Sequence, residues 1–178
     1  HITDYNEWMT ATTGAYTYYL QDESLQYGKL YNIYAILGIN DNDANTPNKE
    51  LAPEGYHIPI YNEWNNVFNL YRNSQDIVSA TYFKSQTSWD VNGNNNSGLD
   101  IKKTGNIAIE NTGFSSNITP QYNSACFAVK TIYNTSFPLA IYSVKLSEYQ
   151  PGNIFFSYVY YDDFPAHQDG ISVRLIKD

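Results

Sequence analysis

Apolar side chains recur at helical spacing in two stretches of the N-terminal half of the chain. In the first, the spacing predicts a helix over residues 27–38 that ends at Gly38. The residues that carry this pattern are Leu30, Tyr31, Tyr34 and Leu37. In the second, apolar residues follow Trp64 at i+3, i+4 and i+7, and we expect Asn62 to cap this helix. The polar segment 39–50 between them predicts a surface loop.

Proline and glycine residues occur at close intervals in the short stretch before the second helix. Pro53 and Gly55 predict a turn, and the apolar alternation from Tyr56 to Ile60 predicts a short extended segment. We interpret His57, within this segment, as a structural residue, because no histidine, cysteine or carboxylate stands near it at metal-ligand spacing.

From residue 74 onward the helical periodicity gives way to short β-rich runs separated by turns. A long polar loop over 87–101 comes first, and we expect Trp89 and Leu99 to attach it to the core. The expected strands lie within residues 105–116, 124–133, 139–146, 154–161 and 171–177. The last three of these predict an antiparallel meander. Two helices packed on a mostly antiparallel sheet with long loops make an α+β fold, and the chain is long enough for one domain over 1–178.

Composition and charge exclude several classes of protein. Hydrophobic residues make up 42% of the chain, which is too many for a disordered protein. The net charge of −8 and the absence of any run of Lys or Arg exclude nucleic acid and anionic membranes as expected partners. No segment has the roughly 20 apolar residues of a membrane span. The one cysteine, Cys126, lies in an apolar run and predicts a buried, unreactive thiol.

Four motifs in order resemble one protein family. They are "YGKLYNIYA", "APEGYHIPIYNEW", "NNNSGL" and the closing "GISVRLIKD", and together they cover roughly residues 5–178. The order and spacing resemble the Fibrobacter succinogenes major paralogous domain. The resemblance implies a C-type-lectin-like fold, related to the branch that contains the formylglycine-generating enzymes. The chain departs from the family pattern where members often have Trp, at Tyr56 and Ile33, and where they often have Cys, at Ala52 and Leu175.

The same resemblance argues against catalysis. Formylglycine-generating enzymes use a pair of cysteines, and this chain has Cys126 alone. No nucleophile elbow supports a Ser-His-carboxylate site. We therefore expect no catalytic residues, no cofactor and no enzymatic activity.

Three short motifs resemble calcium-binding loops without matching them. "DNDAN" (41–45) and "DVNGN" (90–94) place oxygen side chains at alternate positions, but neither keeps the glycine at the sixth place or the acidic residue at the twelfth. "QPGN" (150–153) resembles the calcium motifs of C-type lectins, with Gly152 where a ligand oxygen would be. We expect turns at these places and no metal site.

The candidate binding site is the aromatic run 154–161 with the loop that follows it. Strand alternation puts Phe156, Tyr158 and Tyr160 on one face, so that one face can pack while the other offers rings to a ligand. The alternative is a strand with two buried faces. The predicted ligand-binding residues are Tyr158, Tyr160, Tyr161, Asp162, Asp163, Phe164, His167 and Gln168.

These observations predict a non-catalytic recognition module, extracellular, on the cell surface or on a virion. Its expected partner is a glycan or protein of a bacterial surface, with a homo-oligomer left open. Because diversity-generating retroelements vary residues of this fold just before its closing strand, 154–169 is also compatible with a hypervariable ligand-binding region. The alternative is a structural role as a decoration or fibre-tip domain of a phage particle or pilus, with its main contacts inside its own assembly.

Overall fold

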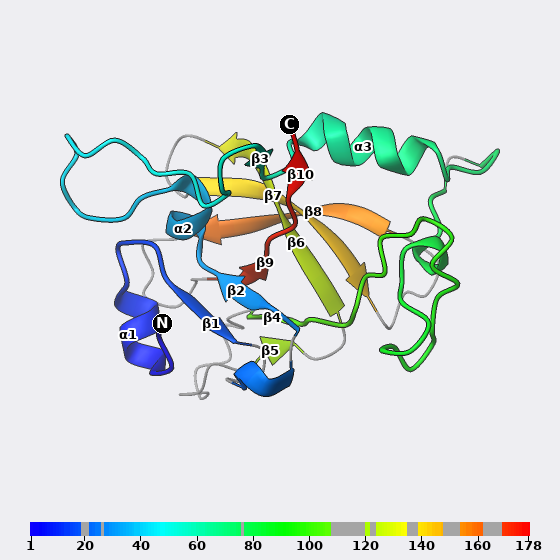
Figure 1. The fold of residues 1–178 in the computed structure, drawn as a ribbon, viewed down its shortest axis with the longest axis horizontal. Coiled ribbons are helices and arrows are strands. Elements are labelled where there is room, and N and C mark those ends of the chain that lie inside the picture. The colour runs from blue at the N-terminus through cyan, green and yellow to red at the C-terminus, as the bar shows by residue number, and fades with distance from the viewer. Residues whose placement is uncertain are drawn as a thin grey trace.

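The fold is an α+β arrangement in which short helices and long loops surround one main sheet (Figure 1). The computed structural model describes residues 1–18, 22–25, 27–75, 77–107, 120–121, 124–134, 139–147, 154–161 and 169–178. Along β8 and at several other strand positions it describes the backbone alone. The α+β class expected from the sequence is confirmed.

The main sheet has six strands in the order β1-β2-β9-β6-β7-β8. Their bounds are β1 Tyr16–Tyr18, β2 Lys29–Tyr31, β6 Ser124–Asn134, β7 Leu139–Ser147, β8 Ile154–Tyr161 and β9 Ile171–Ser172. All neighbours are antiparallel except β6 and β9, which are parallel. The two-residue strand β9 therefore joins the N-terminal hairpin β1–β2 to the meander β6–β7–β8.

Two further pairs of strands lie outside the main sheet. β3 (Tyr56–His57) pairs with β10 (Ile176–Lys177), and β4 (Asn106–Ile107) pairs with β5 (Pro120–Gln121). The strand predicted over 171–177 is therefore wrong as a single element, because β9 and β10 belong to different sheets. The predicted meander is wrong for the same reason at its last strand: β9 lies beside β6 and β2, not beside β8.

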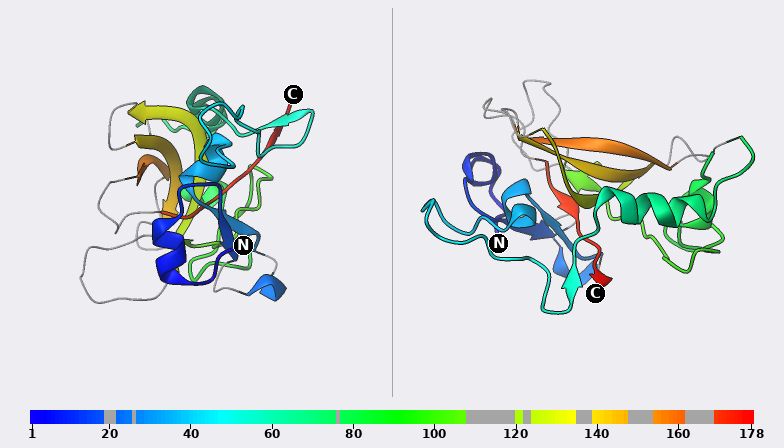
Figure 2. Two further views of the ribbon diagram at one scale, coloured as in Figure 1. Left: turned by 90° about the vertical axis from the view of Figure 1, so that its left-hand side faces the viewer. Right: turned by 90° about the horizontal axis from the view of Figure 1, so that it is seen from above.

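Three α-helices are described, α1 (Tyr5–Thr10), α2 (Ile33–Leu37) and α3 (Tyr61–Asn69), with 3-10 turns at Glu23–Leu25 and Ala80–Tyr82. The helix α1 has no counterpart among the sequence predictions. α1 and α2 lie near the β1–β2 hairpin, and α3 lies at the other end of the molecule with the loops that follow it (Figure 2).

Helix α2 is shorter than the predicted helix over 27–38. Leu30 and its neighbours pair with β1 and β9 instead, so the first part of the run is strand. Asn32 starts the helix, since its side-chain oxygen accepts a hydrogen bond from the Ala35 amide at 3.0 Å. The predicted stop at Gly38 is confirmed: its φ of 80° is left-handed, and a Cβ there would lie 2.4 Å from the Lys49 carbonyl oxygen.

Helix α3 presents the face that the sequence predicts, but its cap differs. Trp64 and Phe68 are buried as expected. Asn62 is inside the first turn; the Ile60 amide donates to the Glu63 carboxylate at 2.8 Å, and the Tyr61 amide donates to the Thr131 hydroxyl at 2.9 Å. The Glu63 carboxylate thus reaches back to the amide of the N-cap residue Ile60, and the cap predicted at Asn62 is wrong because the helix already begins at Tyr61.

Alternate residues of β6 supply two different core clusters. Phe127 and Val129 pack with α3, whereas Cys126 and Ala128 pack with α2. Because successive strand residues point to opposite faces, the two clusters lie on the two faces of the sheet. The Cys126 thiol is buried, as predicted, and burial raises its pKa to about 11.

The predicted polar loop over 87–101 is confirmed, with Trp89 as its attachment to the core. Trp89 is 4% exposed and its indole N–H donates to the Ile101 carbonyl at 2.8 Å. Leu99 packs at the edge of the same cluster. The buried Lys84 holds its ammonium 4.4 Å from the centre of the Trp89 ring.

Candidate functional site

The predicted ligand-binding tyrosines lie on β8, which is the outermost of the described strands of the main sheet. In the register with β7, Tyr158 is opposite Tyr142 and Tyr161 is opposite Leu139. Tyr160 is opposite Ala140. The other predicted ligand-binding residues lie outside the described residues: Asp162, Asp163, Phe164, His167 and Gln168.

The register distributes the three predicted tyrosine positions over two faces of the sheet. Directly opposed residues of an antiparallel pair share a face, so positions 158 and 160 share the face of Tyr142. The Tyr142 ring lies 5.2 Å from the Tyr61 ring of α3, and this is the face that α3 covers. Position 161 falls on the opposite face.

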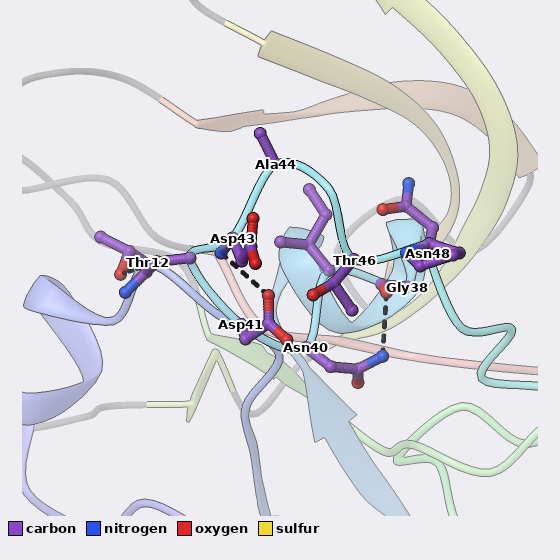
Figure 3. A pocket seen from close by; sticks show the side chains of 11 residues that line it. Thr12, Gly38, Asn40, Asp41, Asp43, Ala44, Thr46 and Asn48 are labelled. Carbon is purple, nitrogen blue, oxygen red and sulfur yellow. Dashed lines mark hydrogen bonds between the residues drawn. The ribbon is translucent and has the colours of Figure 1, made fainter.

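A polar hollow opens on the surface of the described residues between Thr12 and the loop that follows α2 (Figure 3). Its volume is about 300 Å³. Polar and apolar atoms both line it, and seven of its eleven lining residues carry amide, carboxylate or hydroxyl side chains. We call this site the polar hollow; its lining residues are Thr12, Gly38, Ile39, Asn40, Asp41, Asn42, Asp43, Ala44, Thr46, Pro47 and Asn48.

Hydrogen bonds within the loop hold the lining side chains in place. The Lys49 amide donates to the Gly38 carbonyl at 2.9 Å and closes the base of the loop. Asp43 accepts from the Asn45 backbone amide at 2.9 Å, and this bond, with a second from the Asn45 side chain, lowers the Asp43 pKa. The Thr12 hydroxyl donates to the Asn42 side-chain oxygen at 2.8 Å (Figure 3).

The loops that resemble calcium motifs use their oxygen atoms within the chain. In "DNDAN", one oxygen each of Asp41 and Asp43 accepts from the backbone two residues on. In "DVNGN", Asn92 accepts from the Trp89 amide and Asp90 pairs with Lys103 at 3.2 Å. Among the described residues, no three His, Cys, Asp or Glu side chains gather in a way that could hold a metal ion. The "QPGN" motif lies outside the part that the structure describes.

His57 contacts two carboxylates in space, although neither stands at metal-ligand spacing from it along the sequence. Its Nε2 lies 2.8 Å from the Glu63 Oε1, and its Nδ1 lies 2.5 Å from the Asp178 Oδ1. The hydrogen bonds to Asp178 and then Glu63 raise the His57 pKa. Glu63 is six residues away but one turn into α3, and Asp178 arrives through the pairing of β10 with β3, which spacing along the sequence does not show.

A second feature missed by sequence reasoning is an aromatic cluster on the β1–β2 hairpin. The tyrosine cluster consists of His1, Tyr16, Tyr18 and Tyr31, with His1 stacked on Tyr16 at 5.3 Å between ring centres. The Lys29 ammonium lies 4.1 Å from the centre of the Tyr16 ring. Alternation of Tyr16, buried Thr17 and Tyr18 is the signal that could have predicted it.

The polar side of the tyrosine cluster is closed by a carboxylate. The Tyr18 hydroxyl donates to Glu23 at 2.8 Å, which raises the Tyr18 pKa to about 12. Because His1 and Lys29 both contact the Tyr16 ring, much of this cluster is occupied by contacts within the chain.

No family model, curated protein or solved structure matches the chain. Of the described helices, none combines the length and the apolar character that crossing a bilayer requires.

Proposed function

We propose that this chain is a non-catalytic recognition module with a C-type-lectin-like fold that binds a glycan of a bacterial surface. The fold proposal is supported by the four motifs in family order and by the mixed α+β arrangement. Two of those motifs, "APEGYHIPIYNEW" and the closing "GISVRLIKD", meet in space through the pairing of β3 with β10. The proposed location is the cell surface, the extracellular space or a virion.

The observation that carries the proposed function is the polar hollow. Amide, carboxylate and hydroxyl groups together offer both donors and acceptors, which is what a ligand covered with hydroxyl groups requires. The turns at Asp41 and Asp43 hold the loop in one conformation before a ligand arrives. A preformed polar site loses less conformational entropy on binding than a disordered loop.

The state of Cys126 and His57, the two residues most suited to catalysis, supports the proposal that the chain is not an enzyme. Cys126 is buried with a raised pKa, so little thiolate is available for nucleophilic attack. Both ring nitrogens of His57 are engaged by carboxylates. A general base needs a nitrogen that reaches the substrate.

The aromatic strand and loop predicted from the sequence remain a second proposed contact region. Tyr158, Tyr160 and Tyr161 with Asp162 to Gln168 would bind the same class of ligand at the outer strand of the sheet. The assembly role is the second candidate function, favoured by the uncharged eight-residue strand β8 at the end of the described sheet. An outer strand of this kind readily pairs with another chain.

The test is binding to an array of bacterial surface polysaccharides, with calcium and again with a chelator. Asn48→Ala and Thr46→Ala remove polar groups from the lining without removing a side chain that holds the loop. We expect saturable binding that falls at least about tenfold in the double variant, as for the loss of two buried hydrogen bonds. Asn62→Ala, on the exposed side of α3, is the control and should bind as the unchanged protein does.

The outcomes separate the two contact regions and the two functions. Loss of binding in Tyr160→Ala or Asp163→Ala, with the hollow variants unaffected, would move the site to the C-terminal strand and loop. No binding across the array would remove the glycan proposal and favour the assembly role. Equal binding with calcium and with chelator is the result we expect.

A further inference from the structure

Three segments that are distant in the sequence meet at His57. His57 lies in β3, Glu63 lies in the first turn of α3, and Asp178 follows β10. In Figure 1 the end of β10 lies beside β3 and the start of α3. The backbone pairing that brings β10 here is short: Ile176 is opposite His57 and Lys177 is opposite Tyr56.

Side-chain contacts at His57 add to this short backbone pairing. Beyond the two paired residues, the Asp178 amide donates to the Gly55 carbonyl at 3.0 Å. The imidazole of His57 adds a bond to Asp178 from one nitrogen and a bond to Glu63 from the other. The same Glu63 side chain accepts from the Ile60 amide, so the start of α3 belongs to the same set of contacts.

Both imidazole contacts exist together only when the ring carries two protons. An ionised carboxylate only accepts hydrogen bonds, and a neutral imidazole has one N–H to donate. After the ring loses a proton, one nitrogen lone pair faces a carboxylate oxygen at 2.8 Å or less. That contact is then repulsive, and one of the two carboxylates has to move away.

The charged groups around the ring are of both signs, and the ones bonded to it are acidic. Glu63 comes from α3 and Asp178 from the residue after β10. Other charged side chains on the surrounding elements are Glu54 before β3, Lys177 on β10, and Lys130 of β6, which forms an ion pair with Glu50. A third of the His57 side chain is exposed (33%), so solvent protons reach it directly.

We propose that His57, Glu63 and Asp178 form a proton-operated clasp that fixes β10 to β3 and to the start of α3, and that weakens when the imidazole loses a proton. This inference does not depend on the proposed glycan binding. Only residues 173–175 separate β10 from β9, the strand that joins the two halves of the main sheet. The clasp therefore holds β10, which follows directly after the strand that joins the two halves of the sheet.

The experiment measures amide hydrogen exchange of residues 55–58 and 176–178 in the full chain, corrected for the intrinsic pH dependence of exchange. Between about pH 6 and about pH 9, a range that starts below the ordinary pKa of an imidazole and extends above it, we expect opening of these amides to increase. The expected increase is roughly threefold to tenfold, as for the loss of one or two exposed charge-assisted contacts. Amides of β6 and β7 serve as the internal reference and should not change.

Three variants decide whether His57 is responsible. His57→Gln should make the amide exchange of β3 and β10 independent of pH. Asp178→Asn should reduce the pH dependence of that exchange and leave the exchange at the start of α3 unchanged. The double variant His1→Gln and His167→Gln removes the other two histidines and should leave the pH dependence intact. An NMR titration of the His57 ring in the unchanged protein should give a midpoint above 6.5.

The proposal is overturned by pH-independent exchange at β3 and β10 in the unchanged protein. It is also overturned if Asp178→Asn keeps the full pH dependence, or if the His57 ring titrates at or below its ordinary value. The Asp178 variant and the titration keep the test decisive even where His57→Gln fails to fold.

Discussion

The two long polar loops of the described chain have similar composition and opposite structural roles. Both 39–50 and 87–101 are rich in Asn and Asp, and the sequence predicts a surface loop at each. In 39–50, every residue from Asn40 onward is exposed. In 87–101, Trp89 and Ile101 are buried in the larger core cluster.

The hydrogen bonds of the two loops differ in the same way. Bonds in the first loop stay mostly within it, as those between Asp43 and Asn45 do. The second loop is bonded to another segment: the Gly93 amide donates to the Ser85 carbonyl at 3.0 Å, and the Ser97 amide to Tyr82 at 2.9 Å. One loop is part of the core, and the other presents polar groups to solvent. Buried apolar side chains, with Trp89 the largest of them, distinguish the second loop, and overall composition does not show this.

Removing the Trp89 side chain should have the largest effect on the free energy of unfolding. Trp89→Ala deletes a buried ring, its hydrogen bond to Ile101 and the contact with the Lys84 ammonium. We expect it to lower the free energy of unfolding by about 3–5 kcal/mol, as for other buried large-to-Ala changes. Denaturant unfolding measures it. Val91→Ala, exposed in the same loop, should cost less than about 0.5 kcal/mol. Equal effects would mean that the loop is not part of the core.

A smaller loss of stability is expected from a substitution at Gly93, where the loop 87–101 passes close to the backbone of residues 81–84. A Cβ on Gly93 would lie 2.3 Å from the Lys84 carbonyl oxygen and 2.6 Å from that of Thr81. Gly93→Ala should therefore cost roughly 2–3 kcal/mol of unfolding free energy through overpacking.

The matched control for that change is Gly98→Ala in the same loop. Gly98 has a left-handed φ of 70°, but an added Cβ meets nothing within 4 Å. It should cost about 1 kcal/mol through backbone strain alone. A Gly98 variant as unstable as the Gly93 variant would argue against the close approach at Gly93.

Substitutions in the first loop should scarcely change global stability. Asp43→Ala removes the bonds to Asn45 on a fully exposed segment. The midpoint of thermal unfolding should move by less than about 2 °C. Protease cleavage within 39–50 should become faster, because the turn is no longer held. A large drop in the unfolding midpoint would show that this loop stabilises the whole domain.

The smallest expected effect is that of lowering the pH on the turn at Asp43. Hydrogen bonds from Asn45 hold the Asp43 pKa below its ordinary value of 3.8, so the turn is stabilised above that value and loses this support as the pH falls through the lowered pKa. The Asn45 amide resonance should titrate with a midpoint below 3.8. A midpoint at or above 3.8 would mean that the turn does not form in solution.

Local patterns predicted the elements whose partners are near in the sequence. The apolar face of α3, the stop at Gly38 and the strands β6, β7 and β8 follow from short-range periodicity and turn residues. The sequence predicts helix at β2 because Leu30 and Tyr31 continue the spacing of α2, and only the pairing of Leu30 with Thr17 and Ser172 distinguishes strand from helix there.

The contacts that were missed join residues distant in the sequence. Asp178 reaches His57 across 121 positions, and no spacing rule connects them. The polar hollow likewise needs Thr12, which meets Asn42 only after the N-terminal segment folds beside the loop. Of the predicted ligand-binding residues, those on β8 are placed only by the register of that strand with β7, and the others lie outside the described residues.

The position of β9 has a consequence for how the protein is made. A ribosome delivers the β1–β2 hairpin early and the β6–β7–β8 meander late, and the two share no strand pairing until residues 171–172 emerge. The nascent chain therefore carries two partial sheets, each with an unpaired edge, from the time that the meander forms until residues 171–172 emerge. Residues 171–172 close that gap when they emerge, so the two halves of the sheet are joined in one step and not by steady growth from one end.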